Sequence, residues 1–259
     1  MSKTEVVVYA NPDLLAAAAA ARLVTRLVDV QAAKGSASVV LTGGGTGIAI
    51  LKELRESSAR DAIDWSRLDI YWGDERFVPA DSDERNEKQA REALLDHVPL
   101  DPKRVHAMAP SDGEFGDDVD AAAAAYADVL AANTRPEDHG DVPAFDVMLL
   151  GLGGEGHTAS IFPETPAVYE QERSVVAVRD CPKPPPTRVS LTLPAIRRAQ
   201  DIWLVTGGDA KADAVALALA GAGEVQIPVA GARGSRRTLW LLDRGAASKL
   251  TKVYQPPTA

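Results

Sequence analysis

A glycine-rich segment that contains a histidine carries the strongest chemical signal in the chain. The stretch LLGLGGEGHTASIFPET covers residues 149–165, and His157 directly follows its four glycines. Imidazole is largely neutral at pH 7 and can accept a proton, because its pKa is about 6.5. Glu155, two residues earlier, could orient or polarise the ring. We interpret His157 as a candidate general base. The alternative is a loop histidine with no part in chemistry.

A second glycine-rich segment, TGGGTG at residues 42–47, lies between an apolar run and a helical pattern. Such glycines let backbone N–H groups face outward, and a helix N-terminus favours an anion. The segment lacks the Lys-Ser/Thr ending of a Walker A motif, and Ile48 replaces the third glycine of a dinucleotide fingerprint. It therefore predicts phosphate binding, with a tight strand–helix turn as the alternative. The binding residues would be Gly43, Gly44, Gly45 and Thr46.

Charged side chains also follow apolar runs. The stretch WGDERFVP places Asp74, Glu75 and Arg76 after a buried-strand pattern, where ligands of α/β proteins often bind. Arg188 opens RVSLTLP, and Lys211 closes TGGDAK. Arginine suits bidentate phosphate contact and lysine acts as a point charge, so both are candidates to balance an anion. A solvated surface is the alternative for each.

The segment at 149–165 also contains a formal G-x-G-x-x-G, at Gly151, Gly153 and Gly156. A dinucleotide site needs a helix directly after these glycines. Pro163 and Pro166 leave room for barely two turns, so a nicotinamide enzyme ranks below a catalytic loop.

Other nucleophiles and ligands are weaker candidates. Ser160 lacks a G-x-S-x-G elbow, so a Ser-His hydrolase is disfavoured. No histidine pair has metal-ligand spacing, so we expect no metal site. The remaining histidines are interpreted as structural: His97, His106 and His139.

The elements that must position these residues alternate along the chain. Strands are expected at 5–10, 38–43, 68–74, 104–108, 145–152, 174–178, 188–193, 201–207 and 238–243, and helices at 12–34, 44–59, 84–97, 118–134 and 209–220. This alternation predicts an α/β fold, a doubly wound and mainly parallel sheet with helices on both faces. Carboxyl ends of such strands share one edge, so the candidate segments should form one site.

Composition limits the partners. The net charge of -9 argues against nucleic acid and anionic membranes. Cys181 is the only cysteine, which excludes an internal disulfide and fits a reducing compartment. No signal peptide or membrane-spanning run is visible. We expect one α/β domain over 1–259, cytoplasmic, and a monomer or weak homo-oligomer.

Five segments in this order and spacing resemble the 6-phosphogluconolactonase family, within the wider glucosamine-6-phosphate isomerase-like fold. They span nearly the whole chain, and GEGHTASIFP is the most specific part. The segments are LTGGGTG (41–47), WGDERFVPADSDERNEKQAREALL (72–95), LLGLGGEGHTASIFPET (149–165), RVSLTLPAI (188–196) and VTGGDAK (205–211).

The resemblance implies a modified Rossmann-like sheet, and it leaves open whether a small extra sheet is present. It implies hydrolysis of 6-phospho-D-glucono-1,5-lactone to 6-phosphogluconate in the oxidative pentose phosphate pathway, without metal or cofactor. His157 matches the general base, and Asp74 and Arg76 match residues beside it. The glycine-rich loop, Arg188 and Lys211 would hold the sugar phosphate, and Asn86 matches a typical asparagine of the second segment.

One departure from the family pattern and two open assignments accompany the resemblance. Glu155 stands where the family usually has aspartate, so either Asp74 or Glu155 could partner the base. The oxyanion of the tetrahedral intermediate would be stabilised by Arg76 or by backbone N–H groups of 153–156, which include Gly154.

Two alternatives share the fold or the anion site. An amino-sugar phosphate isomerase/deaminase would use Asp74 as base at C2, but the continuation HTASIFPET favours the lactonase. A non-catalytic sugar-phosphate sensor would need the phosphate loop but neither His157 nor Asp74.

Overall fold

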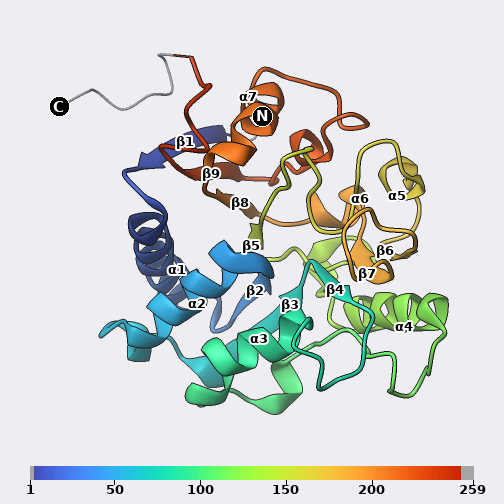
Figure 1. Ribbon diagram of the computed structural model, residues 1–259. Coiled ribbons are helices and arrows are strands. Elements are labelled where there is room, and N and C mark those ends of the chain that lie inside the picture. Colours follow the sequence, from blue (N-terminus) through green and yellow to red (C-terminus); the bar gives the residue numbers. More distant parts are fainter. Residues whose placement is uncertain (1–2, 252–259) are drawn as a thin grey trace.

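A six-stranded parallel sheet forms the centre of the protein (Figure 1). The computed structural model describes residues 3–251. The strand order is β1-β9-β8-β5-β2-β3, and the prediction of a mainly parallel α/β sheet is confirmed. The strands are β1 (Lys3–Tyr9), β2 (Ala37–Leu41), β3 (Leu68–Trp72), β5 (Val147–Leu150), β8 (Asp201–Thr206) and β9 (Arg237–Asp243).

Helices cover one face of the sheet, as Figure 1 shows. They are α1 (Pro12–Lys34), α2 (Gly44–Glu56) and α3 (Asn86–Ala93). Val147 and Leu149 of β5 face this side and share one hydrophobic core with these helices. The boundaries of α1 are those the sequence predicts: the Asn11 side chain accepts a hydrogen bond from the Leu14 N–H, and Gly35 ends the helix at φ +80°.

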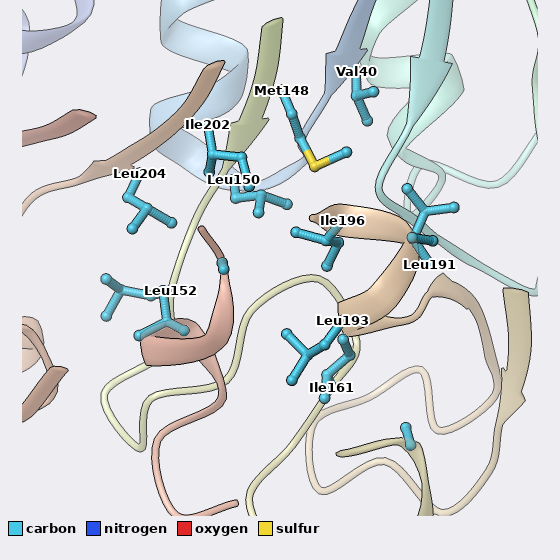
Figure 2. Close-up of a cluster of buried hydrophobic side chains, with 14 of the residues drawn as sticks. Val40, Met148, Leu150, Leu152, Ile161, Leu191, Leu193, Ile196, Ile202 and Leu204 are labelled. Atoms are coloured by element: carbon cyan, nitrogen blue, oxygen red, sulfur yellow. The ribbon is translucent and has the colours of Figure 1, made fainter. Parts of the chain in front are cut away.

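The opposite face carries a second core. Met148 and Leu150 point to it, since successive strand residues alternate between faces. Figure 2 shows both side chains opposite Leu193 and Ile196. This face is covered by α4 (Val119–Ala132), α6 (Leu193–Ile196), α7 (Ala212–Leu219) and a small second sheet.

The small sheet is antiparallel and has the order β4-β7-β6. Its strands are β4 (Asp74–Arg76), β6 (Val175–Val178) and β7 (Arg188–Leu191). Gly73 is the point where the chain passes from one sheet to the other. Its N–H donates to Leu41 O of the large sheet at 3.1 Å, and its carbonyl accepts from Leu191 N of the small sheet at 2.9 Å. The extra sheet that the family resemblance left open is therefore present.

Several expected boundaries differ from the structure. Residues 104–108 are not a strand: they make one bridge, between Val105 and Ile70, directly after a 3-10 turn at Pro102–Arg104. The strand expected to reach 193 ends at Leu191, because the Thr192 side chain caps α6. The strand expected at 68–74 ends at Trp72, and the segment DER, expected at the end of that strand, is itself the strand β4.

The helix expected at 84–97 is α3 followed by a 3-10 turn at Leu95–His97, and the one expected at 209–220 begins as a 3-10 turn at Asp209–Lys211. The remaining short turns are α5 (Pro166–Tyr169) and 3-10 turns at Arg60–Ala62, Trp65–Arg67, Pro136–Asp138 and Pro228–Gly231. Across residues 3–251 no helix has the length and apolar character needed to cross a membrane.

Candidate active site

One cavity of about 240 Å³ lies at the carboxyl ends of the parallel strands. It gathers four segments that are far apart in the sequence: 42–47 after β2, 74–76 after β3, 151–157 after β5 and 205–211 at the end of β8. Ten of the predicted site residues line it, and Glu155 and Gly154 lie outside the lining. The ten are Gly43, Gly44, Gly45, Thr46, Asp74, Arg76, Asn86, His157, Arg188 and Lys211.

His157 is held on three sides. Its Nδ1 lies 2.9 Å from Glu155 Oε1, and its ring stacks on Phe162 with a centroid distance of 4.4 Å. Its carbonyl accepts a hydrogen bond from Gly153 N at 3.0 Å. Since the ionised carboxylate is an acceptor, Nδ1 carries the proton and Nε2 is the nitrogen that can take a proton from a ligand. Burial is the main cause that lowers the pKa of His157, which favours the neutral form of the ring.

Gly153 is required by this arrangement. A Cβ atom there would lie 2.1 Å from His157 Nδ1 and 2.3 Å from Glu155 Oε2. Gly156 has φ +91°, a left-handed conformation that side chains disfavour. The glycines of this loop therefore let the backbone fold tightly around the imidazole–carboxylate pair.

Lys183 is a neighbour of this pair that the sequence analysis did not single out. Its Nζ lies 2.9 Å from Glu155 Oε1 and 3.5 Å from His157 Nδ1. Burial alone would raise the pKa of Glu155, but hydrogen bonds from Lys183, the backbone and His157 lower it to about 2. Lys183 lies in the stretch DCPKPPPT, which predicts a rigid loop. A single cation among these prolines was the only sequence feature in this stretch that could have pointed to Lys183 as a site residue.

Asp74 is buried at the start of β4 and fixed by hydrogen bonds. Ser160 Oγ donates to Asp74 Oδ2 at 2.7 Å, and Arg188 Nη1 lies 3.8 Å from the same oxygen. Asn86 Nδ2 donates to the Asp74 carbonyl at 2.9 Å. Ser160 is fully buried, so its hydroxyl supports Asp74 and is not an exposed nucleophile. Sequence reasoning missed this supporting role because it depends on the packing of two distant segments.

The three charges of the DER segment separate because they lie on a strand, where neighbouring side chains point to opposite faces. Asp74 and Arg76 line the cavity, whereas Glu75 is buried and accepts hydrogen bonds from the N–H groups of Asn86 and Glu87 at 2.7 and 2.8 Å. Burial raises the pKa of Glu75 to about 7, against the lowering effect of Arg85. Glu75 therefore fixes the first turn of α3, and with it Asn86.

Arg76 lines the cavity and has a buried donor without a partner among the residues that the structure describes. Its Nη1 donates to Glu84 O at 2.6 Å, whereas its buried Nε has no hydrogen-bond partner within residues 3–251. Asn86 Oδ1 is likewise buried without a donor in the described part of the chain. Both atoms belong to residues that line the cavity, so a polar ligand can satisfy them.

The glycine-rich loop at 42–47 begins α2. Gly43 is the N-cap, and the described residues provide no side-chain cap for the helix, so its first N–H groups remain available. Gly44 adopts φ +79°, and a Cβ at Gly43 would lie 1.9 Å from Asn86 Oδ1. The helix N-terminus thus opens into the cavity, and free N–H groups at such a position are suited to binding an anion.

Two cations complete the lining. Arg188 is buried, and its Nε and Nη2 donate to the carbonyls of Pro185 and Lys183 at 3.1 and 3.0 Å. Only its Nη1 side faces Asp74. Burial, followed by the charge of Lys183, lowers the pKa of Lys211, and Glu155 opposes that shift.

Comparison with known proteins gives a consistent result. A family model described as glucosamine-6-phosphate isomerases/6-phosphogluconolactonase matches residues 10–240. A 6-phosphogluconolactonase of Streptomyces coelicolor is 62% identical over 260 residues, which cover 100% of both chains. A 6-phosphogluconolactonase of Mycobacterium tuberculosis is 56% identical over 94% of this chain and 97% of its own. The solved structure of a 6-phosphogluconolactonase from Trypanosoma brucei aligns with a TM-score of 0.84 at 30% identity, covering 97% of this chain and 100% of that chain.

Proposed function

The chain belongs to the family of glucosamine-6-phosphate isomerases and 6-phosphogluconolactonases, and on that premise we propose how its cavity hydrolyses 6-phospho-D-glucono-1,5-lactone to 6-phosphogluconate. The observation that carries the proposal is one cavity lined by two kinds of group. One is an imidazole backed by a carboxylate, and the other is an uncapped helix N-terminus. A base and an anion anchor in one cavity suit a phosphorylated ester.

His157 acts as the general base. Its Nε2 takes a proton from a water molecule as the water oxygen attacks C1 of the lactone, which forms a tetrahedral intermediate. The C1–O5 bond then breaks, and the imidazolium returns the proton to the ring oxygen. The product is the open-chain acid, which ionises. Glu155, on Nδ1, stabilises the transient imidazolium and fixes the tautomer.

The oxyanion needs a donor near C1. Within 153–156 the N–H groups of Gly153 and Gly156 already donate to the carbonyls of His157 and Gly153. Gly154 does not line the cavity. We therefore favour Arg76, whose unpartnered Nε belongs to a cavity-lining side chain. In known enzymes one such donor is worth roughly 3–4 kcal/mol in the transition state.

The phosphate binds at the start of α2, on the N–H groups of Gly44, Gly45 and Thr46. Lys211 adds charge there, and Arg188 contributes through its Nη1 side. Anchoring the phosphate fixes C1 opposite His157, and such positioning can supply several kcal/mol of the rate enhancement.

This chemistry is complete with side chains and water, so we propose that it needs no metal or organic cofactor. We also propose that the enzyme works in the cytoplasm, since its single cysteine suits a reducing compartment and its net charge of -9 disfavours binding to anionic membranes. We further propose that it is a monomer or a weak homo-oligomer.

The direct test is proton release from freshly prepared 6-phosphogluconolactone, with and without a chelator, corrected for spontaneous hydrolysis. The proposal expects catalysed proton release in both conditions. The alternative isomerase/deaminase activity predicts ammonia release from glucosamine 6-phosphate instead. Ammonia release without lactone hydrolysis would refute the proposal.

A further inference from the structure

Lys183 is a charged group beside the imidazole–carboxylate pair that the proposed mechanism does not use. It lies on the loop between β6 and β7, whereas Glu155 and His157 lie on the loop after β5. Its Nζ contacts both Glu155 oxygens, at 2.9 and 3.0 Å, and approaches His157 Nδ1 at 3.5 Å. These contacts place a cation on the side of the ring that faces away from the reacting nitrogen.

The loop that carries Lys183 is fixed in place. Arg188 Nη2 donates to the Lys183 carbonyl at 3.0 Å, and Arg188 Nε donates to the Pro185 carbonyl at 3.1 Å. Arg188 itself is buried in β7. The backbone that carries Lys183 is therefore held beside the pair by a strand of the small sheet.

We propose that Lys183 is a positioning residue that keeps His157 unprotonated, and so extends the pH range of the enzyme toward acid. This inference rests on the proposed function. Glu155 alone would favour the imidazolium, because its carboxylate lies 2.9 Å from Nδ1. Lys183 neutralises that carboxylate and repels a second positive charge on the ring. A general base must be unprotonated before it can act.

The charges around His157 support this balance. Glu155 faces it from its own loop, Lys183 from the β6–β7 loop and Asp74 from β4. Burial, the largest cause, and the charge of Lys183 lower the pKa of His157, whereas Glu155 and Asp74 raise it. Lys211 lines the same cavity, and burial followed by the charge of Lys183 lowers its pKa, whereas Glu155 raises it.

The direction of the change in the His157 pKa on removal of Lys183 follows from the charges around the ring. In Lys183→Met the carboxylates remain and the opposing cation is lost, so the pKa of His157 should rise. More of the enzyme is then protonated at pH 6 and inactive as a base. We expect kcat/KM to fall at least about threefold more at pH 6 than at pH 8. Lys183→Arg keeps the charge and should keep the acid limb of the wild type.

The pH dependence of kcat/KM distinguishes a lysine that keeps His157 unprotonated from one that only holds two loops together. A lysine that only ties two loops together would change kcat/KM by one factor at every pH. Lys249→Met is a matched control, since it removes a half-exposed lysine from an ion pair with Asp213 outside the cavity lining. Its profile should overlay that of the wild type.

Titration of the His157 ring by NMR provides a readout that needs no activity, with the signal assigned from its loss in His157→Gln. The proposal expects an upward shift of the His157 titration in Lys183→Met and none in Lys183→Arg. An unshifted titration in Lys183→Met would overturn it, whether or not the wild type hydrolyses the lactone. Absence of lactone hydrolysis in the wild type would instead refute the proposed function.

Discussion

The two sheets contribute to the cavity in different ways. The large parallel sheet supplies loops beyond its strand ends, which bring backbone N–H groups, His157 and Lys211. The small antiparallel sheet supplies side chains from within its strands, with Asp74 and Arg76 on β4 and Arg188 on β7. The loops need glycine to approach the ligand, whereas the strand residues are fixed by pairing, since Arg76 lies opposite Arg188 in the sheet register. We infer that the loops carry the general base and the phosphate-binding N–H groups, whereas the small sheet carries the oxyanion donor Arg76 and fixes Asp74.

The largest expected effect is on the loop side. His157→Gln removes the base but leaves a side chain of similar reach, so turnover should fall by about a hundred- to ten-thousand-fold while the melting temperature changes little. The measurement is proton release with thermal unfolding as a control. Turnover near the wild-type value would remove His157 from the mechanism.

A smaller loss is expected when the same loop is disturbed without touching a charge. Gly153→Ala places a Cβ atom where His157 Nδ1 and Glu155 Oε2 now lie, so the imidazole must move. We expect turnover to fall by about tenfold or more, because small displacements of a catalytic group are costly. Gly223→Ala is the matched control, since its Cβ would meet only the end of the Gln226 side chain and Gly223 lies outside the cavity lining. Equal losses in both variants would contradict the packing argument.

On the small sheet, Arg188→Ala should mainly raise KM for the phosphorylated lactone, by about tenfold, because a charged contact to phosphate is lost. The comparison substrate is unphosphorylated gluconolactone, for which a smaller change is expected. Equal effects on the two lactones would show that Arg188 acts through the carbonyls of Lys183 and Pro185 and not through phosphate.

The smallest effect is expected at Ser160. Ser160→Ala removes the buried hydroxyl that donates to Asp74, which should lower the free energy of unfolding by about 1–3 kcal/mol and turnover by less than tenfold. Ser66→Ala, which removes an exposed hydrogen bond to Asp64, should cost less. Chemical denaturation of both variants tests the comparison. A loss of turnover as large as that of His157→Gln would mean that Ser160 has a chemical role.

The same division between the sheets explains what the sequence could predict. Strands that alternate with helices place glycines and charges at one sheet edge, so the positions of His157, the 42–47 loop and Lys211 in one cavity were predictable. The contribution of the small sheet was less visible. DER is expected at the end of the strand at 68–74, with a solvated surface as the alternative, yet it forms a separate strand that pairs with β7, and Asp74 and Glu75 are buried there.

Lys183 and Ser160 were beyond local patterns. Their partners, Glu155 and Asp74, lie 28 and 86 residues away, and only the packing of the loops around the small sheet brings them together. The strand expected at 104–108 fails for a related reason: its alternating apolar pattern fits a strand, but only one residue pair bridges it to β3.

A crystal structure with bound 6-phosphogluconate tests the central claim most directly, because the product carries both the phosphate and the carboxylate derived from C1. The account predicts the phosphoryl oxygens on the N–H groups of residues 44–46 and the carboxylate within hydrogen-bond distance of His157 Nε2 and Arg76. A product bound with its phosphate away from the start of α2, or with its carboxylate out of reach of His157, would contradict it.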